Sequence, residues 1–415
     1  MHGIRDGLIG ARTPALALVT AFLLGALVIV LTDFESLGGL GADPLGALRG
    51  AIAGVLEGYP VMLAGAIGDP GRILTAFQTG NPEDIAAALR PISETLVSAT
   101  PFIFAGLGLV VSFHAGLFNL GVEGQFLIGG LGAAITAALV AGTLAPPLAL
   151  AIAVLGGIIA GGAYGFVPGL LKARTGAHEV ITTLMLNGIA PNLAYLVAGW
   201  IVLSAPADAI PAVPPLIDLR TIRVDYGFVV ALAMAVAVSL LMSRSTLGFE
   251  LRTAGHSMRA AAAAGIRPGR TTVLAMTLSG ALVGMGSAFY ALGPALGTGG
   301  GPPWDFGYVA IALALLAGRR PGGVVIAAVL YGALTTGAKS MVVATGIPLA
   351  LLTVIVAFAI MLVAAPGLTR WIWRLRPPQP VAVTENSGSI ADASTSIPRP
   401  GPAGTGPRPP ADRGS

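Results

Sequence analysis

One polar stretch between two long apolar runs, residues 113–125, holds the side chains best suited to bind a solute. It carries the carboxylate of Glu123, the carboxamides of Asn119 and Gln125 and the ring of Phe118. A carboxylate accepts hydrogen bonds, and a carboxamide both donates and accepts them, so this set suits the hydroxyl and amine groups of a small molecule. An ionisable residue inside an apolar segment is costly and usually functional. The stretch is therefore a candidate substrate site.

Two side chains from later parts of the chain extend this candidate site. Asn187 lies in the middle of another apolar run, and Asp305 follows Trp304 at the predicted outer edge of a third. Each candidate also has a structural alternative, because Glu123 can form an ion pair or cap a broken helix, and the others can hold helices together. We keep both roles open. The predicted substrate-lining residues are Phe118, Asn119, Glu123, Gln125, Asn187 and Asp305.

The rest of the sequence predicts no catalytic, metal-binding or nucleotide-binding site. The four histidines are scattered, and the absence of cysteine excludes disulfides and thiolate metal sites. Residues 332–340 resemble a phosphate-binding loop, but Ala338 separates the glycine from the lysine, and the run is apolar. Basic and aromatic residues do not cluster as nucleic-acid binding would require. We expect a protein that is not an enzyme, needs no cofactor and binds no nucleic acid.

The composition is that of a protein that crosses a membrane many times. Hydrophobic residues make up 55% of the 415 residues and charged residues 10%, whereas soluble domains carry about 25% charged residues. A crossing helix needs about 20 apolar residues, and ten runs approach that length. The sequence predicts an all-α, polytopic membrane helix bundle of about ten transmembrane helices, with a broken or re-entrant segment near 113–125. The runs are 15–32, 93–112, 118–141, 146–171, 181–204, 226–242, 271–292, 305–318, 323–340 and 347–365.

Charges between the spans predict the orientation, because Lys and Arg are enriched on the cytoplasmic side of a membrane. Segment 243–270 carries five arginines against one glutamate, and segment 33–92 carries seven acidic residues against three arginines. We expect the first inside and the second outside, with both termini cytoplasmic. The run 51–67 contains Glu57 and Pro60 and suits an amphipathic helix at the outer interface. If this run crosses the membrane instead, the N-terminus lies outside.

The same reasoning divides the chain into four parts. Residues 1–32 form the cytoplasmic N-terminus and first span, and residues 33–92 form an extracytoplasmic, partly amphipathic insert. Residues 93–376 form the transmembrane domain, within which 243–270 is a cytoplasmic loop. Residues 377–415 are rich in Pro, Ser, Gly and Thr, and such a composition predicts a disordered cytoplasmic tail.

The loop 243–270 is the second informative stretch. Ser257 is suited to cap a helix that continues through several alanines, and Gly265 is suited to end it. A short helix with basic flanks between two spans provides a contact for a soluble partner. Its alternative is an ordinary basic loop that only sets the orientation. Residue pattern alone does not choose between them.

Four stretches, in order, resemble motifs of the permease subunits of bacterial ABC importers in the branched-chain amino acid and simple-sugar class. Residues 115–125 are similar to the run A-G-L-F-N-I-G-A-E-G-Q of that family. Residues 179–187, 251–266 and 305–313 are similar to three further motifs. The resemblance covers about residues 90–365 and is strongest to the nucleoside and simple-sugar permeases.

This resemblance implies a multi-pass protein of the bacterial cell membrane that works with several partners. They are ABC ATPase subunits, a second permease subunit in a hetero- or homodimer, and an extracytoplasmic substrate-binding lipoprotein. It implies transport of nucleosides, with simple sugars or branched-chain amino acids as alternatives. It also implies that the ATPase subunits engage residues 251–266. The expected ATPase-coupling residues are Arg252, Gly255, Met258, Arg259 and Gly265.

A stand-alone secondary transporter is the alternative from another functional class. Such a transporter is expected to carry paired acidic residues inside the membrane for coupling to protons or sodium. Glu123 is the one plausible acidic residue well inside a predicted span. The sequence therefore favours the ATP-driven importer.

Overall fold

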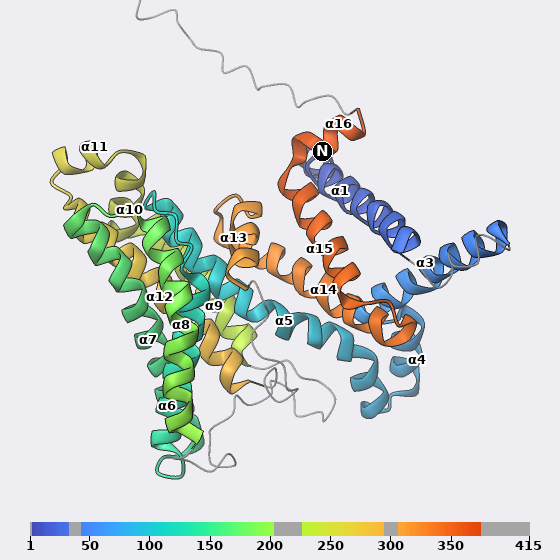
Figure 1. The fold of residues 1–415 in the computed structure, drawn as a ribbon, viewed down its shortest axis with the longest axis horizontal. Helices are drawn as coiled ribbons and strands as arrows, with labels where there is room; N and C mark the ends of the chain where they lie inside the picture. The colour runs from blue at the N-terminus through green and yellow to red at the C-terminus, as the bar shows by residue number, and fades with distance from the viewer. Residues whose placement is uncertain (1, 33–42, 203–225, 294–305, 375–415) are drawn as a thin grey trace, which may run out of the picture. The chain divides into compact units, whose positions relative to one another are not determined.

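The structure is a computed structural model, and it describes residues 2–32, 43–202, 226–293 and 306–374. All regular elements in these ranges are helices (Figure 1), as the sequence predicts. In chain order they are α1 (His2–Thr32), α3 (Pro44–Ile67), α4 (Pro70–Thr79), α5 (Pro82–His114), α6 (Val122–Val140), α7 (Pro146–Thr175), α8 (Glu179–Val202), α9 (Tyr226–Arg244), α10 (Thr246–His256), α11 (Met258–Ala263), α12 (Pro268–Leu292), α13 (Phe306–Leu316), α14 (Pro321–Thr345), α15 (Leu349–Ala364) and α16 (Pro366–Ile372).

Seven of these helices begin at a proline, and in α3, α4 and α5 that proline follows a residue whose side chain caps the helix. Proline suits the first helical position, because its missing N–H would have no partner there and its φ is already helical. Before α3, the side chain of Asp43 accepts a hydrogen bond from the N–H of Gly46 at 3.0 Å. Before α5, Asn81 does the same for Glu83 at 3.1 Å. Local sequence therefore accounts for these helix starts.

Nine helices in the described residues are long and apolar enough to cross a membrane. The number becomes ten if α15 and α16, which meet at a bend of 95°, count as one span. This confirms the prediction of a polytopic bundle of about ten transmembrane helices. The membership differs from the expected ten, however. The helix α3 meets the length and composition of a span, whereas α13 has only 11 residues, or about 16 Å at 1.5 Å per residue.

The helices α6, α7 and α12 approach one another closely at glycines. A Cβ built on Gly157 of α7 would lie 3.0 Å from the carbonyl oxygen of Gly284 in α12 and 3.1 Å from that of Gly129 in α6. One turn along α7, a Cβ on Gly161 would lie 2.5 Å from the carbonyl oxygen of Gly280. Small residues let helix backbones touch in a membrane. Close packing matters there because apolar side chains gain little free energy by moving from lipid into the protein. We call these five glycines the glycine seam.

Around the seam lies a large set of buried apolar residues, which we call the first core. It draws on α5, α6, α7, α9, α12, α13 and the first half of α14. The helix α5 is central to it, since 83% of its most apolar window is buried. The ring of Phe306, at the start of α13, packs 4.0 Å from Phe126 of α6 and 4.7 Å from Phe102 of α5, measured between ring centroids.

A smaller set of buried residues, the second core, joins α1, α3, the second half of α14 and α15. Many of its contacts are made by longer side chains, among them Met62, Met341 and Ile355, and Gly337 of α14 also lies close to the carbonyl oxygen of Met62. The hydroxyl of Tyr59 in α3 donates a hydrogen bond to the carbonyl oxygen of Phe22 in α1 at 2.6 Å. The single helix α14 contributes to both cores, with Val324 in the first and others further along in the second.

Two predicted features lie wholly outside the described residues. The tail 377–415 is one, and Asp305 is the other. The predicted insert 33–92 is described from residue 43 onward and contains α3, α4 and the first part of α5.

Candidate functional site

The polar stretch found in the sequence is a break between two helices. The helix α5 ends at His114, and α6 begins at Val122. We call residues 115–121 the polar turn. Within it, Gly116 has φ +71°, a left-handed conformation that glycine adopts without steric cost. The prediction of a broken segment near 113–125 is confirmed.

Asn119 and Gln125 are buried and bound to each other. The Nδ2 group of Asn119 donates to Oε1 of Gln125 at 2.9 Å, and the Nε2 group of Gln125 donates back to Oδ1 of Asn119 at 3.2 Å. Asn119 also donates to Oγ of Ser279 in α12 and accepts from the N–H of Gly121, both at 2.9 Å. Asn119 and Gln125 are 0% and 1% exposed. Their amides therefore fasten the polar turn to α12.

Asn187 of α8 fastens the other side of the same segment. Its Oδ1 accepts a hydrogen bond from the N–H of Gly124 at 2.9 Å, and its Nδ2 donates to the carbonyl oxygen of Leu120 at 2.7 Å. A helix start leaves backbone N–H groups without partners inside the helix. Asn187 satisfies one of these from a neighbouring helix. A Cβ on Gly124 would lie 3.0 Å from Asn187 Oδ1 and 2.9 Å from the ring of Tyr164.

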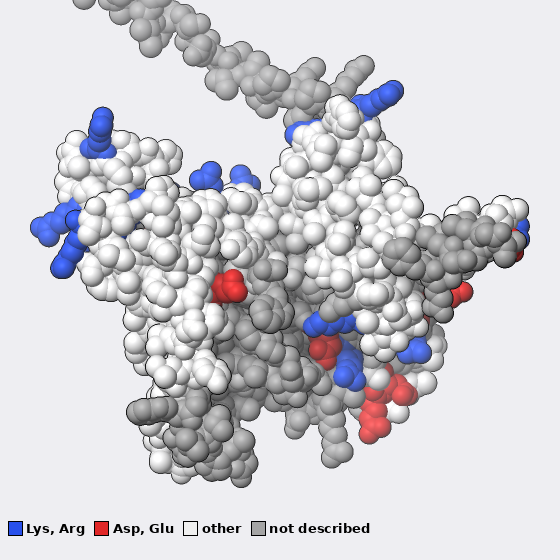
Figure 2. Space-filling view, viewed as in Figure 1, with Lys and Arg blue, Asp and Glu red and all other residues white. Residues whose placement is uncertain are grey.

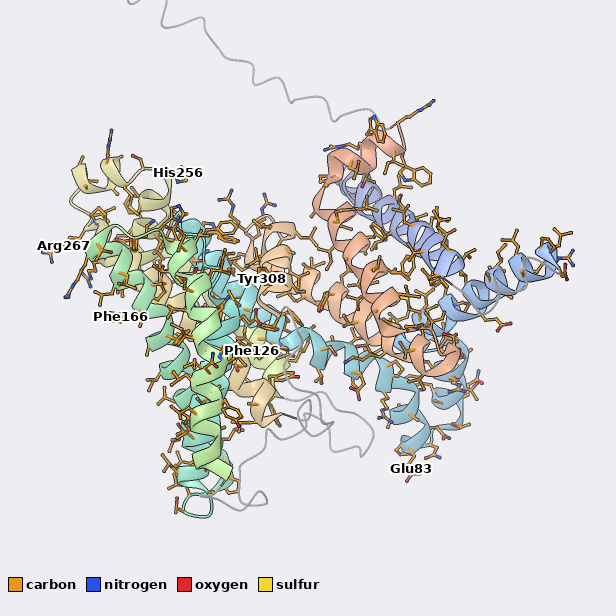
Figure 3. All side chains as sticks on the ribbon, viewed as in Figure 1. Glu83, Phe126, Phe166, His256, Arg267 and Tyr308 are labelled. Atoms are coloured by element: carbon orange, nitrogen blue, oxygen red, sulfur yellow. The ribbon has the colours of Figure 1, made fainter. Side chains whose placement is uncertain are left out.

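Phe118 and Glu123 have accessible surface. The side chain of Phe118 is 39% exposed, and its ring packs on Phe113 at 5.1 Å. Glu123 is half-buried in the first turn of α6, where the helix dipole favours a negative charge. The first turn of α13 lies against it, since a Cβ on Gly307 would be 3.1 Å from the Cβ of Glu123. The labelled Phe126 and Tyr308 mark this meeting of α6 and α13 in Figure 3.

Three further residues around the polar turn were not predicted as site residues from the sequence. Ser279 is one, as described above. The other two form an ion pair between Lys172, at the end of α7, and the 7% exposed Glu179, at the start of α8. Glu179 also accepts a hydrogen bond from the backbone N–H of Phe118. The sequence gives no signal for Ser279, because it is a single serine in an apolar helix. The spacing of Lys172 and Glu179, seven residues apart across a short turn, is a weak signal for an ion pair.

The loop 243–270 contains two short helices, α10 and α11. Ser257 caps α11 by accepting a hydrogen bond from the N–H of Ala260 at 3.2 Å. Gly265, with φ +81°, follows the last turn of that helix. Both features confirm the sequence prediction. The five expected coupling residues lie on α10 (Arg252 and Gly255), on α11 (Met258 and Arg259) and directly after it (Gly265).

Charged side chains are distributed unequally over the described surface (Figure 2). Basic side chains gather at the end that carries α10, α11 and the start of α12, and acidic side chains lie near α4 and the start of α5, together with some basic ones. In Figure 3 the labelled Glu83, in the first turn of α5, lies far from His256 and Arg267 of the loop 243–270. The helix α5 therefore runs from the acidic end toward the basic end.

The C-terminal end of α10 touches the polar turn directly. A Cβ on Gly255 would overlap the carbonyl oxygen of His114 and lie 2.9 Å from the backbone nitrogen of Gly116. In the reverse direction, a Cβ on Gly116 would lie 3.1 Å from the Cα of Gly255. The two predicted functional stretches, far apart in sequence, are thus in backbone contact.

Comparison with protein families supplies the identification. The model of the permease component of branched-chain amino acid transport systems matches residues 92–365. The chain belongs to this family. That range includes the polar turn, α10, α11 and every buried residue of the first core. As a member, the chain is a multi-pass membrane protein and an ABC transporter permease, a class of subunit that works with ATPase and substrate-binding partners.

Individual permeases are similar to the chain over most of its length. A guanosine ABC transporter permease protein of Bacillus subtilis is 34% identical over 342 residues, which cover 79% of this chain and 92% of that protein. A nucleoside ABC transporter permease protein of Lactococcus lactis is 29% identical, covering 85% of this chain and 90% of its own length. A glucose ABC transporter permease protein of Haloferax volcanii is 32% identical over 65% of this chain and 75% of its own.

Proposed function

We propose that the chain is the membrane-spanning subunit of an ATP-driven importer for nucleosides. One observation carries the choice of solute, the 34% identity with a guanosine permease over 92% of that relative's length. The glucose permease relative makes simple sugars the second candidate. Separate ATPase subunits hydrolyse ATP, an extracytoplasmic binding protein delivers the solute, and a second permease subunit completes the membrane part.

We propose that two side chains with accessible surface, Phe118 in the polar turn and Glu123 directly after it, contact the solute. The ring of Phe118 offers a face on which a nucleobase can stack, and Glu123 can accept hydrogen bonds from ribose hydroxyls or base amines. Asn187 borders them on α8, half-buried and with its amide engaged by the backbone. Asp305 stays a predicted member of the set, outside the described residues.

Asn119 and Gln125 act from behind this surface in the proposal. Their amide groups are engaged with one another, with Gly121 and with Ser279. Such a satisfied buried network holds a backbone in one conformation. Direct contact of these two residues with the solute stays a prediction and requires the network to open during transport.

We propose that the ends of the chain lie on the cytoplasmic side together with α10 and α11. The basic surface of those helices supports this orientation through the positive-inside rule. The indole Nε1 of Trp373, after the last helix, donates a hydrogen bond to Oγ1 of Thr20 at 2.8 Å. Thr20 lies near the start of the apolar window Ala15–Thr32. The start of the apolar window of α1 and the end of α16 thus lie at the same end of the bundle.

This orientation bears on α3. The helix α1 then delivers the chain to the outer side, and the acidic start of α5 also lies on the outer side. Residues 33–82 begin and end on one side, so α3 does not make a single crossing. We therefore propose that α3 rests at the outer part of the bundle against the end of α14, where Gly58 lies beside Met341. Glu57, exposed midway along α3, then reaches the headgroup region.

Uptake of radiolabelled solutes tests the proposed function. The chain is deleted from its host and restored as wild type, as Glu123→Gln or as Glu83→Gln, an exposed carboxylate in the first turn of α5. Deletion should abolish guanosine uptake, and wild type and Glu83→Gln should restore it. Glu123→Gln should lower uptake about tenfold, the value of one hydrogen bond to a charged group.

Other outcomes would redirect the proposal. Loss of ribose uptake alone would assign the importer to sugars. Unchanged uptake of both solutes after deletion would contradict the solute class, and branched-chain amino acids would be measured next. Guanosine uptake that persists when the partner ATPase is inactivated would contradict the ATP-driven importer and favour a stand-alone transporter.

A further inference from the structure

We propose that α10 acts on the solute site through the backbone contact between Gly255 and residues 114–116. The helices α9 and α12, which flank the coupling loop, would then be supports rather than the main route of coupling. This inference rests on the proposed function and names Gly255 and Gly116 as positioning residues within it. It concerns how motion reaches the site and does not depend on which solute is carried.

The contact is a close approach of two backbones. A methyl group on Gly255 would overlap the carbonyl oxygen of His114 and lie 2.9 Å from the nitrogen of Gly116. A methyl group on Gly116 would lie 3.1 Å from the Cα and 3.2 Å from the carbonyl oxygen of Gly255. Backbone atoms, unlike the tip of a long side chain, cannot rotate away from a neighbour. A displacement of α10 toward the polar turn therefore displaces the backbone of residues 114–116 directly.

The helix α10 is built to move as one piece. Ser245 caps its start by accepting a hydrogen bond from the N–H of Gly248 at 2.9 Å, and Ser257 ends it with an extended backbone. Both flanking residues are outside helical geometry, so α10 is a helix distinct from α9 and α11, although Gly248 of α10 packs closely against the backbone of Leu241 at the end of α9. Within α10, the side chains of Leu251 and Ala254 are buried. They keep the same face of α10 toward the bundle.

On the other side of the contact, the polar turn is tied to two helices, α12 and α8. Asn119 binds Ser279 of α12, and Asn187 of α8 binds the backbone at Leu120. The N–H of Phe118 is bound by Glu179 at the start of α8. A shift at Gly116 therefore moves Phe118 and the start of α6, which carries Glu123. The path from the ATPase contact to the exposed site is only a few residues long.

Reconstituted transport tests this inference. The complete transporter, with ATPases, partner permease and binding protein, is placed in proteoliposomes, and guanosine transported and ATP hydrolysed are both measured. Gly255→Ala should lower guanosine transported per ATP about tenfold, within the usual range of coupling energies, while hydrolysis stays near the wild-type rate. Gly269→Ala, in the first turn of α12, is the matched control, because its Cβ would have no neighbour closer than 3.6 Å.

ATP hydrolysis at the wild-type rate shows that the Gly255→Ala transporter is assembled. A variant that fails to fold or assemble is recognised because it loses hydrolysis as well as transport. If it does not assemble, Gly116→Ala replaces it and should change coupling in the same direction. Wild-type transport per ATP in an assembled Gly255→Ala or Gly116→Ala transporter would overturn the inference. Wild-type protein that hydrolyses ATP without carrying guanosine would contradict the proposed solute alone.

A spectroscopic measurement decides the inference without any solute. The chain contains no cysteine, so a spin label on Phe118→Cys reports on the polar turn, with the complex lacking that substitution as background. Trapping the ATPases with ATP and vanadate should change the spectrum of the label. Adding Gly255→Ala should abolish that change, and adding Gly269→Ala should keep it. An identical change in all three proteins would overturn the inference.

Discussion

The two cores hold their helices together in different ways. In the first core, α6, α7 and α12 meet at the glycine seam, where the closest neighbours of each glycine include backbone atoms of the facing helix. In the second core, the closest neighbour of Gly58 is the terminal methyl of Met341, and one glycine, Gly337 of α14, closely approaches a backbone atom, the carbonyl oxygen of Met62 in α3. Helices in lipid associate through packing and hydrogen bonds, because their apolar side chains gain little by leaving the lipid. Backbone contact fixes the distance between helices more strictly than flexible side chains do.

This difference matches where the polar turn lies. Its partners Ser279 and Asn187 come from α12 and α8, and hydrogen bonds of about 2.9 Å require those helices at a set distance. The seam provides that distance for α12. The second core carries none of these contacts and needs only to stay assembled. Substitutions of the same kind should therefore have unequal effects in the two regions.

The largest effect is expected from the same substitution made in each core. Gly161→Ala should destabilise the protein by about 3 kcal/mol or more, because the new methyl would lie 2.5 Å from Gly280 O and 2.7 Å from the Cα of Gly284. Gly58→Ala should cost less than about 1 kcal/mol, since Met341 can turn aside and alanine favours the helix. Unfolding free energies in mixed detergent micelles measure both. Equal losses would contradict the distinction between the cores.

A middle-sized effect is expected at the buried amide network. Asn119→Ala leaves the amide of Gln125, the hydroxyl of Ser279 and the N–H of Gly121 without this partner, and should cost about 2–3 kcal/mol. Asn192→Ala is the matched control, because Asn192 is exposed on α8 and donates only to Gly188 of its own helix. The same unfolding measurement applies, and equal stability of the two variants would show that the network adds nothing.

The smallest effect is expected at the end of the second core. Trp373→Phe removes the hydrogen bond to Thr20 and should cost about 1 kcal/mol. Trp371→Phe serves as its control, since Trp371 is 77% exposed. Guanosine uptake by both variants should equal that of wild type, because α16 lies outside the first core. A loss of uptake in Trp373→Phe would mean that the second core takes part in transport.

Local sequence was sufficient for the helices and for the break between them. The composition predicted an all-α membrane bundle, and the polar residues of 113–125 predicted an interruption, because ionisable and amide groups are costly in lipid. Ser257 and Gly265 predicted the bounds of α11, since capping depends on residues within one turn of the helix end. The four ordered motifs predicted the family.

Only the tertiary structure determined which helix faces meet. The most apolar windows of α5 and α8 have similar mean hydropathies of 2.0 and 1.5, yet 83% of the first is buried and 11% of the second. In a membrane, side chains that face lipid are as apolar as those that face the core, so hydropathy does not separate them. The pairing of Asn119 with Ser279 and the contact of Gly255 with Gly116 join residues more than a hundred positions apart. Such pairings depend on how whole helices pack, and no local pattern encodes them.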